Sequence, residues 1–178
     1  MNGRFKLALV VAVVSVAAAG TLALAGGGKK QIRERLSGYE ETQLALSTPG
    51  KGKFKVRTDR TKISYRLSYA DLEAPVTQAH IHFGARGQSG GISVFLCTNL
   101  GNGPAGTQEC PPQPATVTGT IGPSDVIGPV DQGIAPGEFD ELLHAIRAGA
   151  TYANVHSEKY EAGEIRAQIE RDHDKSRR

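Results

Sequence analysis

Large side chains are scarce in this sequence of 178 residues: tryptophan is absent, methionine occurs once, and aromatic residues make up 6%. Glycine (22) and proline (9) are abundant by comparison. This balance is typical of many short elements joined by turns, and it favours an all-β fold over a helix bundle. The length and the 39% of hydrophobic residues predict one globular domain with a core of its own.

Recognisable catalytic motifs are also lacking. The sequence contains no Ser-His-Asp order, nucleophile elbow, phosphate-binding loop or paired-carboxylate motif. The glycine-rich stretch at Gly84, Gly87, Gly90 and Gly91 fits a tight hairpin better than a phosphate cradle, which would be expected to open a helix. We therefore expect a protein that is not an enzyme.

A long uncharged run occupies the N-terminus. Arg4 and Lys6 precede 19 residues without a charge, residues 7–25, which end in the small-x-small pattern of a signal peptidase site. We predict a signal peptide over residues 1–25 and export from the cytoplasm, so that the protein is either secreted or held at the cell envelope. Because about 20 apolar residues span a bilayer, a retained N-terminal anchor is the alternative.

A strong charge of one sign is missing from the remainder. Without residues 1–25 the chain has 19 Lys and Arg against 18 Asp and Glu, so its net charge is about +1. Such a chain has no strong field to attract nucleic acid, and we expect membrane contact only through an uncleaved N-terminus. Residues 26–35, with four cations, are predicted to be a solvated linker.

Only two cysteines are present, Cys97 and Cys110. In an exported protein we expect them to form a disulfide, which would close a short Gly/Pro-rich loop and stabilise it by about 3 kcal/mol. Nothing near the pair has the spacing of zinc ligands.

Alternating apolar and polar residues predict half-buried antiparallel strands. The apolar members of these patterns are Phe54 and Val56; Ile63, Tyr65, Leu67 and Tyr69; Ile92, Val94 and Leu96; and Val117 and Ile121. Residues 151–157 and 163–170 predict two further strands.

One segment predicts a helix instead. Phe139, Leu142, Leu143 and Ile146 share one helical face, and Gly149 is placed to end the helix. His144 lies off that face and is expected in solvent. The charged residues 171–178, with His173, are predicted to be a disordered tail.

Five stretches, in this order and spacing, resemble the CHRD domain, which is named for chordin and occurs in many microbial exported proteins: LSGYEE at Leu36, AHIHFGARGQSGG, IGPSDVIGP, EFDELLHAIRAGATYANVHS and GEIRAQI. The resemblance covers roughly residues 36–170. It implies an antiparallel β-sandwich or barrel, immunoglobulin-like or superoxide-dismutase-like, with one short helix. Glu41-Thr42-Gln43 and Ala167 depart from the usual pattern, which commonly has Val-Pro and Gly there.

The two histidines of AHIH, His80 and His82, point to one face of a strand because they are two residues apart. The same parity places Asn154 with His156 on a second strand, and Glu164 with Arg166 on a third. If these strands are neighbours, their apolar faces form the core and these polar residues form one cluster.

Two interpretations of the cluster remain open. His80, His82 and His156 could supply three nitrogens to copper or zinc, loosely resembling the copper half of copper-zinc superoxide dismutases. Alternatively, the cluster is a hydrogen-bonded network in which Glu164 pairs with Arg166 or a histidine. We favour a non-enzymatic module that binds an unknown extracellular or envelope protein, with metal binding as the alternative function.

Overall fold

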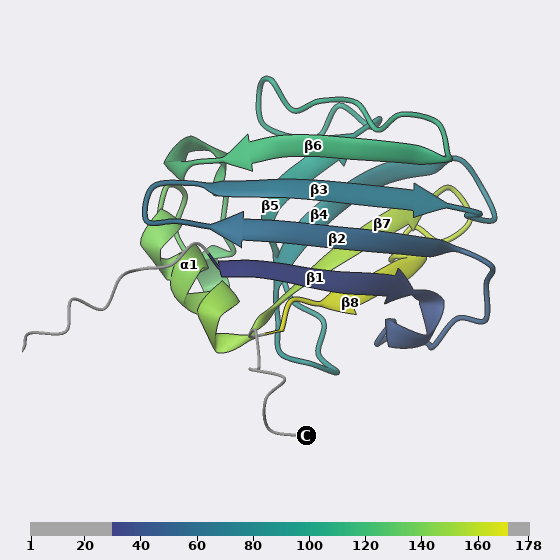
Figure 1. The fold of residues 1–178 in the computed structure, drawn as a ribbon, viewed down its shortest axis with the longest axis horizontal. Coiled ribbons are helices and arrows are strands. Elements are labelled where there is room, and N and C mark those ends of the chain that lie inside the picture. Colours follow the sequence, from purple (N-terminus) through teal and green to yellow (C-terminus); the bar gives the residue numbers. More distant parts are fainter. Residues whose placement is uncertain (1–29, 171–178) are drawn as a thin grey trace, which may run out of the picture.

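The computed structural model describes residues 30–170, so the expected signal peptide (1–25) and tail (171–178) lie outside it. Eight antiparallel strands form one sheet that curls into a nearly closed barrel, in the order β5-β4-β7-β8-β1-β2-β3-β6 (Figure 1). The strands are β1 (Lys30–Ser37), β2 (Lys51–Thr58), β3 (Ile63–Ala70), β4 (Val76–Phe83), β5 (Ile92–Thr98), β6 (Ala115–Ile121), β7 (Thr151–Ser157) and β8 (Ile165–Gln168). The antiparallel all-β fold expected from the sequence is confirmed.

The curled sheet has two layers. The front layer consists of β6, β3, β2 and β1, and the back layer consists of β5, β4, β7 and β8 (Figure 1). Alternate residues of both layers point inward, and one hydrophobic cluster fills the space between them from Ile32 to Ile169. The described residues 30–170 thus hold eight paired strands around one hydrophobic core, as an independently folding domain does.

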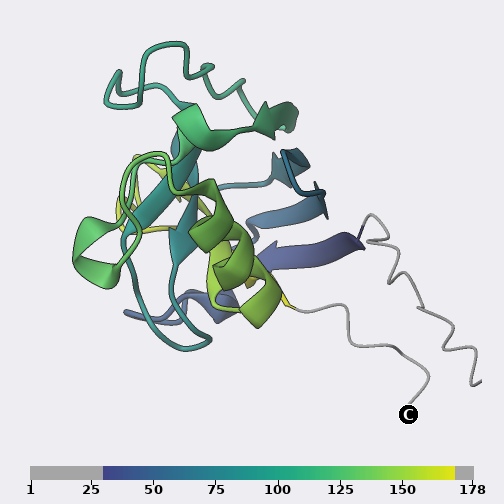
Figure 2. The same cartoon turned by 90° about the vertical axis from the view of Figure 1, so that its left-hand side faces the viewer.

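The one α-helix of the described residues, α1 (Phe139–Ala148), lies across one end of the barrel (Figure 2). The stripe predicted from the sequence is buried, and Gly149 ends the helix in the left-handed conformation at φ 73°. The side chain of His144 is 66% exposed, as expected. Short 3-10 turns occur at Gly38–Glu40, Pro123–Asp125 and Val130–Gln132. No helix within residues 30–170 has the length and apolar character needed to cross a membrane.

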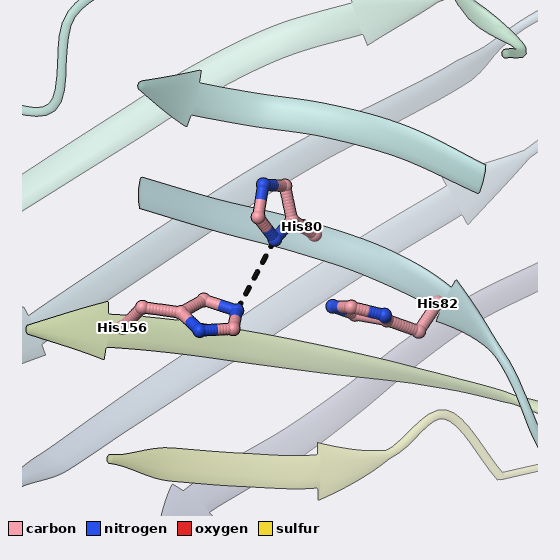
Figure 3. A group of neighbouring side chains, drawn as sticks. All are labelled: His80, His82 and His156. Carbon is pink, nitrogen blue, oxygen red and sulfur yellow. Dashed lines mark hydrogen bonds between the residues drawn. The ribbon is translucent and has the colours of Figure 1, made fainter. Parts of the chain in front are cut away.

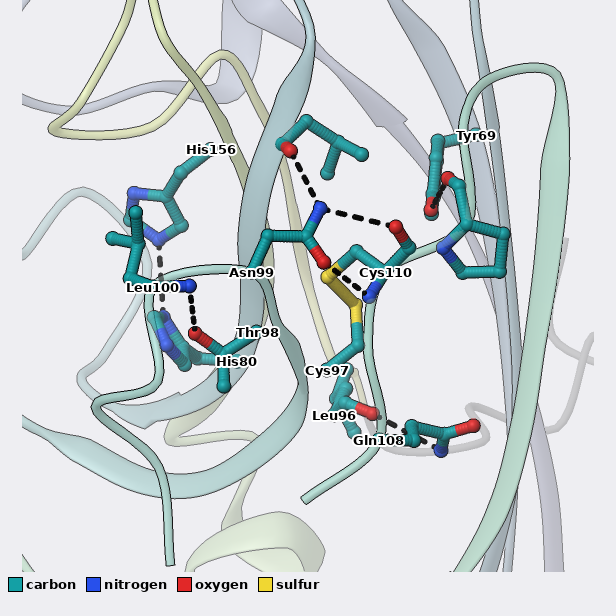
Figure 4. Close-up of a disulfide and its surroundings, with 12 residues drawn as sticks. Tyr69, His80, Leu96, Cys97, Thr98, Asn99, Leu100, Gln108, Cys110 and His156 are labelled. Atoms are coloured by element: carbon teal, nitrogen blue, oxygen red, sulfur yellow. Dashed lines mark hydrogen bonds between the residues drawn. A yellow bond between two sulfur atoms is a disulfide. The ribbon is translucent and has the colours of Figure 1, made fainter.

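The disulfide expected between Cys97 and Cys110 is present, with 5.0 Å between the Cα atoms (Figure 4). The side chain of Asn99 holds the loop that the disulfide closes. The side-chain amide of Asn99 donates to the carbonyl groups of Val76 and Cys110, and its oxygen accepts from the Cys110 N–H at 2.9 Å. These bonds satisfy backbone groups that the irregular loop could not pair by itself.

The prediction of a linker over residues 26–35 is wrong from Lys30 onward. β1 begins there and pairs with β2 along its full length, from Lys30 opposite Thr58 to Ser37 opposite Lys51. Ile32 and Leu36 point into the core. Arg33 and Arg35, two of the cations that suggested a solvated segment, instead occupy the exposed face of β1, where charged side chains are tolerated.

Candidate metal centre

The three histidines lie on the outer face of the back layer. β4 pairs with β7 so that His80 is opposite Asn154 and His82 is opposite Tyr152, while the intervening Ile81 points into the core. The residues of this outer face are nevertheless buried, with His80 0%, His82 8% and His156 5% exposed. The parity argument from the sequence correctly placed the three imidazoles together.

One ring nitrogen of each imidazole lies within 4.8 Å of those of the other two. The Nδ1 atom of His80 is 3.2 Å from the Nε2 atom of His156, and His82 directs a ring nitrogen toward the same space (Figure 3). Among residues 30–170, no other group of three His, Cys, Asp or Glu side chains comes together in this way. The arrangement brings three nitrogens from two strands to a common centre.

Burial keeps these imidazoles neutral. It lowers the pKa of His80 to about 2, with the neighbouring His156 and His82 acting in the same direction. Burial also lowers the pKa of His82 to about 4, against an opposing hydrogen bond to Gly90, and it lowers the pKa of His156. All three rings are therefore in the uncharged form that binds metal ions at pH 7.

Two backbone carbonyl groups orient the neutral rings. The Nδ1–H of His82 donates to Gly90 O at 3.0 Å, and the Nδ1–H of His156 donates to Glu161 O at 2.8 Å. Because a carbonyl only accepts, the Nε2 atoms of both rings carry lone pairs. The His80 Nδ1–H then donates to His156 Nε2, and the Nε2 atoms of His80 and His82 are buried with no partner in the described structure.

Gly90 has to be a glycine for this arrangement. A Cβ atom at residue 90 would lie 1.7 Å from Phe83 O, a distance at which the backbone itself must move. The loop at residues 84–91 therefore passes close enough to β4 for the carbonyl of Gly90 to reach His82. The hairpin expected from the glycine-rich sequence thus has a second role, which is to orient a histidine.

Aromatic and cationic groups surround the imidazoles. Tyr152 stacks on His82 with ring centroids 4.7 Å apart and planes 3° from parallel. The guanidinium of Arg166 lies 3.4 Å from the centre of the Tyr152 ring, on a side chain that donates to Thr42 and to Gln88 O. Arg166 thus belongs to the same outer face, as expected from the sequence, but it reaches His82 through Tyr152.

Glu164 does not join the imidazoles, so its expected place in the cluster is wrong. The Glu164 carboxylate accepts from Ser157 Oγ at 2.5 Å and from the Glu73 N–H at 2.8 Å. Glu164 precedes β8, which begins at Ile165, and follows Gly163 at φ 128°. The strand parity that places Arg166 therefore does not extend to Glu164, and no Glu164–Arg166 pair forms.

A cavity of 330 Å³ adjoins the cluster at His82, and a glutamate missed in the sequence lies in its wall. Burial raises the pKa of Glu41 to about 7, opposed by the charge of Arg166 and by a hydrogen bond from Asn154. Glu41 and Thr42 belong to the tripeptide that departs from the usual CHRD pattern. That departure was the one sequence feature that could have drawn attention to Glu41, but no pattern in the sequence predicted that Glu41 lies beside β7.

Fold and site together define a small antiparallel β-barrel domain with a buried imidazole cluster on the outside of one layer. The family model of the CHRD domain matches residues 33–169, and the chain belongs to this family. Neither a curated protein nor a solved structure matches the chain.

Proposed function

We propose that the protein is an exported, non-catalytic metal-binding protein that holds one copper or zinc ion between His80, His82 and His156. The carrying observation is the unpartnered Nε2 of His82, which is buried while Nδ1 of the same ring is fixed by a backbone carbonyl. A buried acceptor without a partner costs free energy that a bound cation recovers. Carbonyl-oriented imidazoles are the usual arrangement of histidine ligands.

The ligand set supports copper and zinc over other ions. Imidazole nitrogens are ligands of intermediate softness, and a set of three without a thiolate or carboxylate suits these two metals. At equal geometry Cu²⁺ binds to such a set more tightly than Zn²⁺. Metal–nitrogen bonds of about 2.0 to 2.1 Å place neighbouring ligand nitrogens about 3.3 to 3.6 Å apart. The His80–His156 pair is already at 3.2 Å, so the remaining adjustment is mainly an approach of His82.

A metal ion bound between the three imidazoles would require a different proton position on His80. Its Nδ1 faces the common centre but carries the hydrogen that is donated to His156. To coordinate through Nδ1, the His80 ring has to hold its proton on Nε2 instead, the nitrogen that has no partner in the structure. His82 and His156 need no such change, because their lone pairs already face inward.

Two features support export. Residues 7–25 are uncharged and follow Arg4 and Lys6, as in a signal peptide. The Cys97–Cys110 disulfide is of the kind that persists in oxidising compartments outside the cytoplasm. An extracytoplasmic protein that binds copper or zinc could buffer the free ion there.

The test is a titration of residues 26–178 with Cu²⁺ and with Zn²⁺, together with the metal content of untagged protein purified from its own source. We expect one tight equivalent, lost in His82→Ala and kept in His144→Ala. His144 is the matched control because it is an exposed histidine on α1. Equal titrations of wild type and His82→Ala would contradict the proposal.

An interaction module at the cell envelope is the second candidate function. It is supported by a different surface of the barrel, the outer face of the front layer, which carries exposed cationic side chains.

A further inference from the structure

The outer face of the front layer carries seven exposed cations and no acid. The outward-pointing residues of its four strands are Gln31, Arg33, Arg35 and Ser37 on β1; Lys51, Lys53, Lys55 and Arg57 on β2; Ser64, Arg66, Ser68 and Ala70 on β3; and Thr116, Thr118 and Thr120 on β6. We call this surface the basic face. The net charge of +3 therefore divides into +7 on the basic face and −4 on the remainder of the chain.

The register places like charges directly opposite one another. Arg33 faces Lys55, and Lys55 faces Arg66, which makes a row of three cations across three strands. Like charges at opposite positions of neighbouring strands destabilise a sheet. The protein therefore carries a repulsion on this face that an alternation of charges would avoid.

Most of these cations have no carboxylate partner. Lys51 pairs with Asp71 at 2.6 Å, at the end of the strand. Within residues 30–170, no ion pair neutralises the other six cations of the basic face. By contrast, Arg86 and Lys159, elsewhere on the surface, both contact glutamates. The charge of the basic face is available to an external anion.

The shape and composition of the face select the kind of anion. Four strands of about eight residues cover roughly 25 by 15 Å, and the seven cations line none of the cavities at the loops, at the disulfide or beside α1. Between the cations lie serine, threonine, glutamine and alanine, with no exposed aromatic ring for stacking on bases or sugars. An open surface of this kind fits an array of phosphates better than a single ligand.

The position of the face in the chain points to a membrane. β1, which contributes Arg33 and Arg35, begins at Lys30. The uncharged run of residues 7–25 ends only a few residues earlier in the sequence. A chain inserted in or leaving a bilayer through that run therefore delivers the edge of the basic face close to the lipid headgroups.

We propose that the basic face docks on a bilayer surface rich in anionic phospholipid. Each Lys or Arg near such a surface adds about fivefold to the affinity at moderate salt. The docking holds the barrel with its front layer against the headgroups and its back layer, with the imidazole cluster, turned toward solvent (Figure 2).

The test is cosedimentation of residues 26–178 with phosphatidylcholine vesicles that contain or lack phosphatidylglycerol. These residues include all eight described strands and their hydrophobic core but not the apolar run, so binding reports the barrel alone. We expect binding only to the vesicles with phosphatidylglycerol, and its loss at about 0.5 M salt, where the Debye length is only a few ångströms.

The triple variant Arg33→Gln, Lys55→Gln, Arg66→Gln should weaken this binding roughly a hundredfold. The matched control, Arg86→Gln, Arg147→Gln, Lys159→Gln, removes the same charge away from the basic face and should bind nearly as well as wild type. Thermal unfolding of both variants verifies that they are folded. Equal losses in the two triples, or no binding to anionic vesicles, would overturn the proposal. Retention on an anionic polysaccharide without vesicle binding would instead assign the face to a glycan.

Discussion

β2 in the front layer and β4 in the back layer both alternate polar with apolar residues, and both direct the apolar ones into the same core. Their polar residues have opposite environments. Lys53, Lys55 and Arg57 are exposed to solvent, whereas His80 and His82 are buried. The two layers show that alternation identifies the face on which a residue lies but not whether that face is exposed. In this barrel the long cationic side chains lie on the exposed outer face, and the imidazoles lie on the covered one.

The sharpest way to test this difference is to truncate an arginine on each outer face. Arg166→Ala should lower the free energy of unfolding by about 2 to 4 kcal/mol, because it removes the guanidinium that packs on the Tyr152 ring and leaves Gln88 O and Thr42 without their donor. Arg66→Ala should change it by no more than about 0.5 kcal/mol. Urea denaturation measures both. Similar losses in the two variants would show that the back layer is as exposed as the front.

The second prediction concerns pH. Unfolded histidines take up protons near pH 6.5, whereas His80 and His82, with pKa values of about 2 and 4, remain neutral in the folded barrel. The unfolded chain therefore binds more protons below pH 6.5, and the free energy of unfolding should fall by roughly 2 kcal/mol for each of these histidines between pH 7 and pH 5. Arginines and lysines of the basic face stay charged throughout and contribute nothing in this window.

Single variants separate the contributions to this pH dependence. In His82→Gln, the decrease in the free energy of unfolding between pH 7 and pH 5 should be smaller by roughly 2 kcal/mol than in the wild type. In the control His144→Gln, which changes an exposed histidine, it should not shrink. An unchanged drop in His82→Gln would mean that His82 is already protonated, or open to water, in the folded state.

Glu41 gives an effect of opposite sign. Its pKa is about 7 in the folded protein and 4.5 as the ordinary value, so ionising it destabilises the fold as the pH rises through this range. Glu41→Gln should therefore raise the free energy of unfolding by about 3 kcal/mol at pH 8 and by less than about 1 kcal/mol at pH 5. Glu141→Gln, on the exposed side of α1, is the control and should be neutral at both values. Stabilisation that is equal at pH 5 and pH 8 would contradict the raised pKa.

The smallest expected effect belongs to the basic face. Lys55→Glu places an acid between Arg33 and Arg66 and should stabilise the barrel by a few tenths of a kcal/mol at low salt. The gain should vanish at about 0.5 M salt because exposed charges are screened there. A loss of stability at low salt would show that the cations of this row do not repel one another.

The parts of the molecule that follow from local periodicity could be predicted. The stripe from Phe139 to Ile146 predicted α1, and the two-residue spacing of His80 and His82 predicted their common face. The export of the chain and its partner protein stay predictions. The linker was misjudged because four cations in seven residues resemble a solvated segment, although Ile32 and Leu36 are enough to hold β1 in the sheet.

The parts that depend on loops could not be predicted. Glu41 lies beside Asn154 only because the chain after β1 turns back over the outside of β7, and no local pattern encodes that contact. Glu164 was misplaced because a parity that holds within β8 was applied one residue before the strand begins. The basic face was overlooked for a related reason: its seven cations lie on three strands, and they gather only once the register is known.

The two carbonyl groups that orient His82 and His156 belong to the backbone and not to any side chain. In evolutionary terms, the direction of these lone pairs is inherited as the length and path of two loops, so most substitutions at Glu161 leave it unchanged. Gly90 is the exception, since any side chain there collides with Phe83. A relative that preserves all three histidines but lengthens either loop would keep the same ligands without the carbonyl groups that orient them. A glycine at the position of Gly90 therefore distinguishes relatives that retain an oriented site from those that do not.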